Sequence, residues 1–377
     1  MKILVIAQDL TPGDGWGTIA RNTVTGLMKR GNDVCVLLHD TTDAQLCPEM
    51  TGLPSATAPL GSPVSWIRTA FAIRRAVKKF QPDVIHFAVE PYALAMPIAK
   101  WMVALPPWAI VMLGTYTVQP LYLRHTKWLM KRVYKECDSF PVCSEYTKSQ
   151  YIKAIEDMCG KKLSAEVEAK SPLFRLGILP PEGGHKKQPD TVKRILFVGG
   201  VKPRKGVLDL VKGLRAYSKI SKVPFHADII GALNEKSDYT RRIRAEISDG
   251  GLSEMVTLHG HASREVVDAA YANADVFAML SKPDGLHFEG FGVVFIEANV
   301  LGIPTIGPNG SGCKEAVDEG VSGFTVDPED PEAVAKRFQW VLEDGQINPA
   351  DCVSWAKKHS VDQQVASYEE VYGSIVK

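Results

Sequence analysis

The sequence predicts an α/β protein of two Rossmann-like domains that face one another across a cleft. Its 377 residues exceed one ordinary core, because a domain typically holds about 100 to 200 residues. Short apolar runs alternate with longer amphipathic runs, a pattern typical of strand-helix units around a parallel sheet. A polar segment rich in Pro and Gly at 180–190 interrupts this alternation and predicts an interdomain linker.

The alternation predicts the elements in order. In the first half, strands are expected at 2–7, 33–38, 84–87, 109–113 and 139–142, and helices at 18–29, 65–80, 121–135 and 146–155. In the second half, strands are expected at 195–198, 227–230, 256–259, 275–278, 305–306 and 324–326, and helices at 331–343 and 361–375. The expected domains are therefore 1–180 and 181–355, with a closing helix within 356–377 that can cross back to the first domain. Ligands are expected at the carboxyl ends of the strands.

Composition excludes several classes of protein. A hydrophobic content of 45% and a charged content of 23% argue against disorder, collagen and a coiled coil. Residues 1–180 hold 21 Lys and Arg against 15 Asp and Glu, whereas residues 181–377 hold 23 against 28. The basic half is too weakly charged for a dedicated nucleic-acid binder, so no nucleic acid is expected, but it favours an anionic substrate or membrane surface.

The cysteines and the apolar segments bear on location. Seven cysteines without a Cys-x-x-Cys motif or zinc spacing predict reduced thiols in a cytoplasm. Five apolar residues after Lys2 are too few for a signal-peptide core. The apolar stretch 93–113 contains Lys100 and three prolines, so a buried helix followed by a buried strand is expected there instead of a membrane span.

The strongest site signal is a glycine-bearing loop that opens an apolar run between Glu289 and Glu297. Gly290 and Gly292 let backbone amides approach a ligand, and a helix that begins there offers unpaired N–H groups to a pyrophosphate. The two glutamates stand on the order of 8 Å apart along the helix, at about 1.5 Å per residue, which suits hydroxyls on either side of a diphosphate. An ordinary turn with a solvated glutamate is the alternative.

A second signal is the segment from Lys202 to Gly206, directly after the strand expected at 195–198. Pro203 stiffens the loop, and Arg204 and Lys205 are candidates to neutralise a departing diphosphate, a task that a metal would otherwise perform. No metal cluster in the sequence competes for the same cleft, and neither a metal nor a cofactor is expected. A solvated basic loop is the alternative.

The expected strands of the first half end in further candidates. Gly15 and Gly17 follow the first strand, and their amides are candidates to contact the same diphosphate or another substrate. His86 and Glu90 lie at the end of the strand at 84–87 and are candidates to contact a second substrate, bound by the first domain. A simple turn and packed side chains are the alternatives.

Taken together, these motifs resemble the retaining GT-B glycosyltransferases of family 4 (glycosyl transferases group 1) over nearly the whole chain. Further matches are Ser144–Thr147, Leu301–Pro304 and Gly323–Pro328. The resemblance implies metal-independent transfer of a sugar from a nucleotide diphosphate with retention, the donor in the C-terminal domain and the acceptor in the N-terminal one. It further implies that Glu289 contacts the donor sugar and Glu297 the ribose, while the amides of Phe291, Gly292 and Val293 meet sugar and phosphate.

Two positions depart from the family pattern. The basic residue usual five positions before Lys205 is Gly200 here, and Arg204 or Lys202 can substitute. The histidine usual before Gly-Thr is Leu113, which cannot hydrogen-bond a sugar hydroxyl. Leu113 predicts either a donor without a 6-hydroxyl, such as a 6-deoxyhexose or pentose, or a role taken by another residue.

Basic residues recur on two expected helices of the first half. They are Arg68, Arg74, Arg75, Lys78 and Lys79 on one, and Arg124, Lys127, Lys131, Arg132 and Lys135 on the other. With Trp66, Trp101 and Trp128 near them in sequence, they predict a peripheral contact with anionic lipid at the inner face of a membrane. Solvated helix faces are the alternative.

The primary hypothesis is a retaining hexosyl, deoxyhexosyl or pentosyl transferase. Its donor is a nucleotide-diphosphate-sugar, its acceptor is a glycan, a lipid-linked saccharide or a small molecule, and closure of the domains excludes water. Two alternatives remain. Leu113 and Gly200 leave open a non-catalytic nucleotide-sugar-binding partner of an active transferase. A nucleotide-sugar epimerase on the same fold would form product without an acceptor.

Overall fold

The computed structural model describes residues 1–11, 15–41, 46–179 and 191–376. The linker expected at 180–190 lies outside these ranges, as does Asp14. The chain divides into two compact units, which are described separately. Unit 1 comprises Met1–Leu179 and Ser360–Lys377, and unit 2 comprises Pro180–His359.

Unit 1 is built around a parallel sheet. Its strands are β1 (Lys2–Ile6), β2 (Asp33–Leu38), β3 (Glu49–Thr51), β4 (Val84–Phe87) and β5 (Trp108–Ile110), and within the described residues they form a five-stranded sheet of order β3-β2-β1-β4-β5. Its helices are α1 (Gly15–Lys29), α2 (Ala58–Gly61), α3 (Pro63–Phe80), α4 (Met96–Met102), α5 (Gln119–Tyr122), α6 (Lys127–Glu136), α7 (Glu145–Cys159), α8 (Lys161–Ala169) and α15 (Val361–Ile375). Short 3-10 turns are η1 (Glu90–Ala95) and η2 (Thr115–Thr117).

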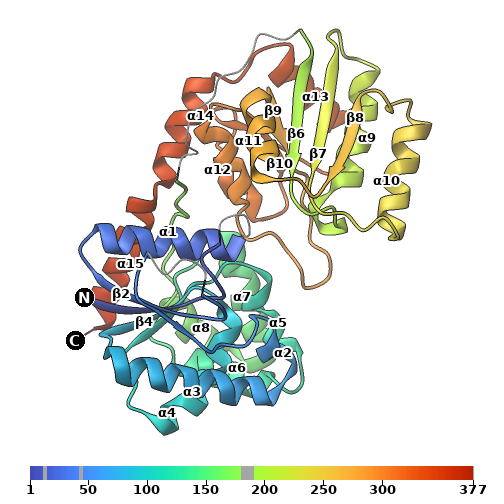
Figure 1. Cartoon of the computed structure of the whole chain (residues 1–377). Coiled ribbons are helices and arrows are strands. Elements are labelled where there is room, and N and C mark those ends of the chain that lie inside the picture. The colour runs from blue at the N-terminus through green and yellow to red at the C-terminus, as the bar shows by residue number, and fades with distance from the viewer. Residues whose placement is uncertain (12–14, 42–45, 180–190, 377) are drawn as a thin grey trace. The chain divides into compact units, whose positions relative to one another are not determined.

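Helices cover both faces of this sheet. The C-terminal helix α15 packs against α1 on one face, and α3 and α4 lie on the other (Figure 1). The central strand is therefore buried on both sides, which explains its continuous apolar run: Ile3, Leu4, Val5 and Ile6 are fully buried. Ser360 begins α15 by accepting a hydrogen bond from the Gln363 amide (3.2 Å).

Unit 2 repeats this architecture. Its strands are β6 (Lys193–Val198), β7 (Phe225–Ile230), β8 (Val256–Gly260), β9 (Val276–Ala278), β10 (Thr305–Pro308) and β11 (Gly323–Val326), which within the described residues form a parallel six-stranded sheet of order β11-β10-β9-β6-β7-β8. Its helices are α9 (Val207–Ser218), α10 (Asp238–Asp249), α11 (Arg264–Asn273), α12 (Val293–Val300), α13 (Pro331–Leu342) and α14 (Pro349–Ala356). The turns η3 (Pro203–Lys205), η4 (Gly312–Ala316) and η5 (Lys357–His359) complete it. On one face α9 packs between α10 and α13, and α11 and α12 lie on the other (Figure 1).

The predicted fold of two parallel α/β domains is confirmed, two local predictions are wrong, and one strand was missed. Residues 139–142 form only isolated bridges beside β5, because Pro141 has no N–H to continue a ladder. The helix expected at 121–135 is split into α5 and α6, since Leu123 is extended between them. The edge strand β3 was not expected, because three residues are too few to show a period of two.

Candidate functional site

The turn η3 brings two cations to the carboxyl end of β6. The carbonyl of Arg204 accepts hydrogen bonds from the hydroxyl of Ser281 and from the amide of Lys282, both at 2.9 Å. Gly206 has a φ of +69°, and a Cβ there would lie 1.8 Å from the carbonyl oxygen of Leu280. Only glycine therefore lets α9 begin so close to this loop, which explains the Lys-Gly pair of the motif.

Arg204 and Lys205 hold the carboxylate of Glu289 between them. Arg204 Nη1 lies 2.6 Å and Lys205 Nζ 2.7 Å from the same oxygen, Oε2 of Glu289. Burial works against the charged form of Glu289, but the two cations outweigh it and hold the pKa of Glu289 below its usual value. No hydrogen-bond partner of the other oxygen, Oε1, is found among the described residues, so this oxygen can accept a further hydrogen bond.

The loop after Glu289 is shaped by η4, which the sequence analysis did not single out. The amide of Gly312 donates to the carbonyl of Glu289 (3.2 Å), and a Cβ on Gly312 would lie 1.9 Å from the carbonyl oxygen of Gly290. Gly292 adopts a φ of +86°, where a Cβ would meet Cys313 Sγ at 2.9 Å. The signal for this contact was the Ser-Gly-Cys segment after β10, which only acquires meaning once the two loops are seen together.

Three backbone amides at the start of α12 are free to donate to a ligand. The amides of Phe291, Gly292 and Val293 donate no hydrogen bond within the described part of the chain. The ring of Phe291 is buried and lies 5.4 Å from the ring of His359, which anchors the loop. Together with the positive end of the helix dipole, these amides form a place where an anion is stabilised.

Glu297 lies one to two turns further along α12. The hydroxyl of Tyr271 donates to Oε2 of Glu297 at 3.5 Å. Burial raises the pKa of Glu297, and the positive charge of Arg264 partly offsets that rise. Arg264 is itself paired with Asp268 at 2.9 Å. Tyr271 and Arg264 belong to α11 and were missed by the sequence analysis, because on a helix they show only an amphipathic pattern.

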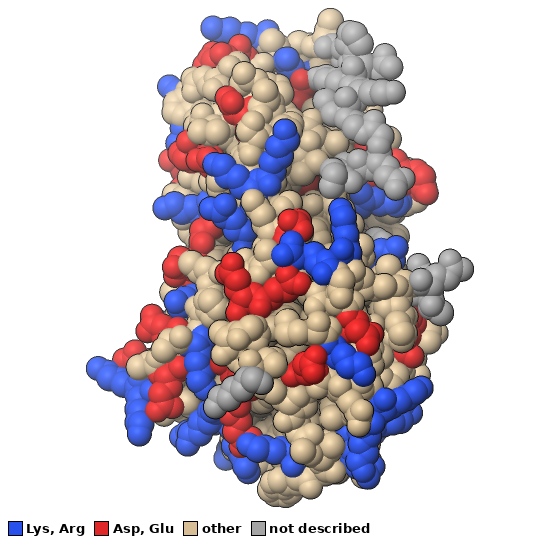
Figure 2. All heavy atoms as spheres, turned by 90° about the vertical axis from the view of Figure 1, so that its left-hand side faces the viewer, with Lys and Arg blue, Asp and Glu red and all other residues tan. Residues whose placement is uncertain are grey.

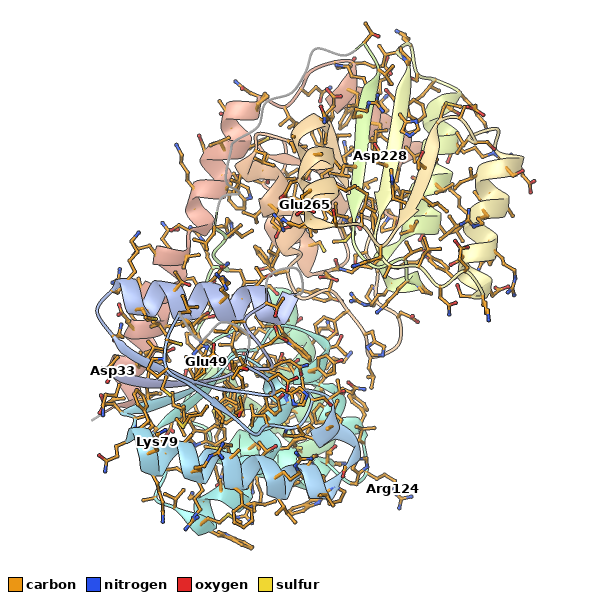
Figure 3. The ribbon with its side chains drawn as sticks, viewed as in Figure 1. Asp33, Glu49, Lys79, Arg124, Asp228 and Glu265 are labelled. Atoms are coloured by element: carbon orange, nitrogen blue, oxygen red, sulfur yellow. The ribbon has the colours of Figure 1, made fainter. Side chains whose placement is uncertain are left out.

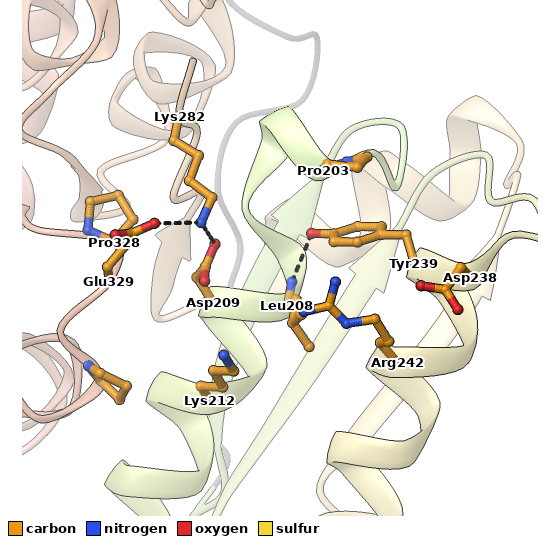
Figure 4. A pocket seen from close by; sticks show the side chains of 11 residues that line it. Pro203, Leu208, Asp209, Lys212, Asp238, Tyr239, Arg242, Lys282, Pro328 and Glu329 are labelled. Carbon is orange, nitrogen blue, oxygen red and sulfur yellow. Dashed lines mark hydrogen bonds and ion pairs between the residues drawn. The ribbon is translucent and has the colours of Figure 1, made fainter. Parts of the chain in front are cut away.

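A hollow of about 530 Å³ adjoins the turn η3 on unit 2, and Pro203 forms part of its wall (Figure 4). Lys282 Nζ lies 2.9 Å from Asp209 and 3.0 Å from Glu329. Tyr239 accepts a hydrogen bond from the amide of Leu208 (3.0 Å). Because two carboxylates neutralise Lys282, this lysine supports the turn through its amide and does not supply a free charge.

In unit 1, Glu90 lies just after β4, at the carboxyl end of the sheet. Its side chain is almost fully buried; Oε1 accepts from the amide of Leu113 (3.1 Å), and Oε2 has no hydrogen-bond partner among the described residues. Burial raises the pKa of Glu90 to about 7, against smaller opposing contributions from backbone amides and the Trp16 side chain. The rings of Trp16 and Tyr116 lie 4.8 Å apart.

His86 lies inside β4 and is turned toward α15. Its Nδ1 is 2.7 Å from the hydroxyl of Tyr372, its ring is 4.9 Å from that of Tyr368, and only 1% of it is exposed. Burial lowers the pKa of His86 to about 3, so the ring is neutral. This environment favours the packed alternative over contact with an acceptor.

Three glycines differ in their surroundings: Gly15 and Gly17 of the first loop, and Gly200, where the family usually has a basic residue. Gly15 begins α1, and a Cβ there would meet nothing within 4 Å, whereas Gly17 is buried. A Cβ on Gly200 would be in ordinary contact, 3.6 Å from Lys202 Cε. Packing therefore does not require glycine at 15 or 200.

Three general features of the described residues concern metal sites, membrane spans and thiols. No group of three or more His, Cys, Asp or Glu there has an arrangement that could hold a metal ion. Within the same residues, no helix combines the length and the apolar character needed to cross a membrane. All seven cysteines are free thiols.

Two parallel α/β units, with a basic turn and open amides at the carboxyl edge of the second sheet, define the class of GT-B nucleotide-sugar glycosyltransferases. Two family models match the chain: Glycosyltransferase Family 4 over residues 13–156 and Glycosyl transferases group 1 over residues 184–359. The chain belongs to glycosyltransferase family 4, whose members use nucleotide sugars.

Curated relatives are similar at modest identity. The GDP-mannose-dependent alpha-(1-6)-phosphatidylinositol monomannoside mannosyltransferase of Mycobacterium tuberculosis is 26% identical over 292 residues, 72% of this chain and 70% of the relative. The GDP-mannose-dependent alpha-mannosyltransferase of Corynebacterium glutamicum is 23% identical over 373 residues, 94% of this chain and 84% of the relative.

Solved structures share the fold. A glycosyltransferase from Rickettsia africae superposes with a TM-score of 0.74 at 18% identity, covering 100% of this chain and 98% of its own. Anabaena Alr3699/HepE, solved in complex with UDP and glucose, superposes with a TM-score of 0.74 at 17% identity, covering 99% and 100%. At these identities the likeness establishes the architecture alone.

Proposed function

We propose that this chain is a retaining, metal-independent transferase that moves a sugar from a nucleotide diphosphate to a hydroxyl of a glycan, a lipid-linked saccharide or a small molecule. The observation that carries the proposal is the cluster of Glu289, Arg204 and Lys205 beside the open amides that begin α12. It combines two cations for phosphate, a free carboxylate oxygen for a sugar hydroxyl, and unpaired N–H groups. All of these groups lie at the carboxyl edge of one sheet.

Each group has a part in the reaction. As the bond from the anomeric carbon to the phosphate oxygen breaks, its electron pair remains on the diphosphate, and Arg204 and Lys205 stabilise that charge. The acceptor oxygen bonds to the anomeric carbon on the same face, and its proton passes to the departing phosphate oxygen. Oε1 of Glu289 orients the sugar, and Glu297 binds the ribose hydroxyls. No step requires a metal or cofactor.

Unit 1 is proposed to bind the acceptor. Glu90, Trp16 and Tyr116 lie near the carboxyl ends of its strands, and the unpartnered Oε2 of Glu90 is a hydrogen-bonding group for a hydroxyl. Gly15 and Gly17 remain candidates for contacts to donor or acceptor through their amides. His86 is the weakest candidate because it lies inside β4 and its ring packs against Tyr368 and Tyr372 of α15.

The relatives guide the choice of substrates. Two of them are described as GDP-mannose-dependent, and one acts on a phosphatidylinositol monomannoside. GDP-mannose and a lipid-linked acceptor are therefore the first substrates to test, and a cytoplasmic location at a membrane would suit such an acceptor. Leu113 supports a different donor, one without the 6-hydroxyl.

The donor is tested by comparing GDP-mannose with GDP-rhamnose, which lacks only the 6-hydroxyl of the mannose. Turnover of GDP-rhamnose above that of GDP-mannose is expected if Leu113 sets the preference, and the reverse order dismisses that hypothesis. Retention is read from the anomeric coupling of the product by NMR, and metal independence from turnover in excess EDTA. Product that forms only with an acceptor separates transfer from epimerisation, and donor binding without any product would favour the non-catalytic alternative.

Nucleotide binding is tested by thermal shift with GDP, UDP and ADP. A nucleotide at 100 times its Kd should stabilise the folded chain by about 2.7 kcal/mol. Glu297→Ala should abolish most of the shift, whereas Glu265→Ala on the exposed side of α11 should leave it unchanged (Figure 3). An equal shift in Glu297→Ala would mean that its ribose role is wrong.

A further inference from the structure

One helix of unit 1 exposes large apolar side chains to solvent. On α3, 65% of Val64, 48% of Ile67 and 53% of Phe71 are exposed. Their spacing of three and four residues places them on one stripe, opposite the buried side that includes Trp66 and Ile73. A stripe of this kind on a surface is typical of a contact site.

The same helix is strongly basic. Its 18 residues contain Arg68, Arg74, Arg75, Lys78 and Lys79, and no Asp or Glu. Within the described residues none of these five cations is ion-paired; Arg75 donates instead to the carbonyl of Thr51. Arg68 lies beside the apolar stripe, and Arg75, Lys78 and Lys79 continue the exposed side of the helix beyond Phe71, so the cations are concentrated in its second half.

Neighbouring helices extend this surface. The sequence predicts a buried helix near 93–113, but 79% of Trp101 at the end of α4 is exposed, and 54% of Trp128 on α6. α4 packs against both α3 and α6. The ring of His125 stacks on that of Trp66, with centroids 6.4 Å apart. This stacking places Arg124, the residue before His125, near the start of α3.

The pictures agree with this reading. Figure 3 shows Lys79 and Arg124 at opposite ends of α3, with the arginine side chain directed away from the body of unit 1. Figure 2 shows Lys and Arg side chains, in blue, beside largely uncharged surface in the lower part of the face in view.

We propose that unit 1 docks on an anionic lipid bilayer through the outer face of α3, defined by Val64, Ile67, Phe71, Lys78 and Lys79. At about 1.5 Å per residue the helix is about 27 Å long and can lie along the bilayer surface. Its apolar stripe enters the headgroup boundary and the cations of its second half meet lipid phosphates, as in interfacial helices. The proposal goes beyond the proposed function and does not depend on donor chemistry.

Charge complementarity favours lipid as the occupant. An acidic protein partner would also attract the cations. However, the polar groups of such a partner would face the apolar stripe, whose side chains offer them no hydrogen-bond partner. The lysines of α6 are poorer candidates than the sequence implied, since Lys127 and Lys131 are half-buried. The contact therefore centres on α3.

The experiment is vesicle flotation of the full chain. Phosphatidylcholine vesicles with 30 mol % phosphatidylglycerol are compared with phosphatidylcholine alone, each at about 0.1 and 0.5 M salt, between which the screening length falls about twofold. The test variant is Phe71→Gln with Lys78→Glu and Lys79→Glu. The matched control is Ile220→Gln with Lys219→Glu and Lys222→Glu, since these three residues are also exposed but lie on unit 2.

Wild type and the control variant should float with the anionic vesicles only, and less at high salt. The test variant should lose about 30-fold or more of its partition coefficient, because each cation near the surface contributes about fivefold. Equal loss in the control, binding independent of phosphatidylglycerol, or no flotation of wild type would overturn the proposal. Self-association that the α3 variant abolishes, without vesicle binding, would also overturn it. The GDP thermal shift should be the same in all three proteins, so a failure of lipid docking is distinguishable from a failure of the proposed function.

Discussion

Replacing Glu90 by glutamine should change how the stability of the protein depends on pH. The carboxyl is buried, and its pKa rises from 4.5 to about 7 on folding. Between these values the unfolded chain loses the proton while the folded chain keeps it, so the free energy of unfolding of the wild type falls by about 1.36 kcal/mol per pH unit. Its contribution is therefore fully present below pH 4.5 and is lost as the pH rises toward 7.

Glutamine has the same shape and does not ionise, so it does not lose stability in this window. Relative to wild type, Glu90→Gln should gain about 2.5 kcal/mol between pH 5 and pH 8. The acceptor for the amide of Leu113 is retained, so the difference near pH 5 should be small.

The assay is urea unfolding at pH 5, 6, 7 and 8, followed by tryptophan fluorescence. Five of the seven tryptophans lie in unit 1, so the signal reports mainly the unit that contains Glu90. Glu166→Gln, on the exposed surface of α8, is the matched control and should give a difference that does not vary with pH. A flat difference for Glu90→Gln as well would mean that the buried carboxyl is already ionised in the folded protein, and would refute the reasoning.

Three further substitutions, one of them with Gly15→Ala as its comparison, test the donor site. Glu289→Gln should destabilise unit 2 by about 2 kcal/mol in urea unfolding, at or below the low end for a broken ion pair because Arg204 and Lys205 keep some exposure. It should bind GDP severalfold more tightly by calorimetry, since the cations lose a competing anion; unchanged stability and affinity would contradict the pairing. Gly206→Ala should cost at least about 2 kcal/mol, because alanine at a left-handed φ also meets the carbonyl of Leu280, whereas Gly15→Ala should change stability by less than about 1 kcal/mol. The free energy of unfolding of Gly200→Arg should stay within about 0.5 kcal/mol of wild type, and its affinity for GDP should rise. A loss of folding would show that this position has no room for a side chain.

The fold was predictable because strands buried on both faces appear as continuous apolar runs. The strands at 33–38 and 84–87 have the expected bounds, and the central strand ends one residue earlier than expected. The failures have local causes. Pro141 has no amide to donate, so a run that is apolar enough for a strand makes only isolated bridges, and a three-residue edge strand leaves no pattern to detect.

The site was predictable as separate motifs but not as a cluster. Each motif can be recognised from its own loop, because glycine marks a place where the backbone must turn and a run of cations follows a predicted strand. That Arg204 and Lys205 share one oxygen of Glu289 depends on which strands become neighbours, and β6 pairs with β9 although about 80 residues separate them. Tyr271 near Glu297 carries no sequence signal at all, because its function depends on a partner on another helix.

Burial is the property that sequence reasoning determines least well, and it decides between the candidates of unit 1. His86 and Glu90 lie four residues apart, and both are almost completely buried. Nδ1 of His86 has a hydroxyl partner and its ring has aromatic neighbours from α15, but Nε2 of His86, like Oε2 of Glu90, has no hydrogen-bond partner among the described residues. An unsatisfied buried oxygen costs free energy unless something binds it. What distinguishes the two is position: His86 lies inside β4 and faces α15, whereas Glu90 follows the carboxyl end of the strand and is the better candidate for contact with a substrate. On α3, exposure likewise places on the surface apolar residues that a sequence would assign to the core.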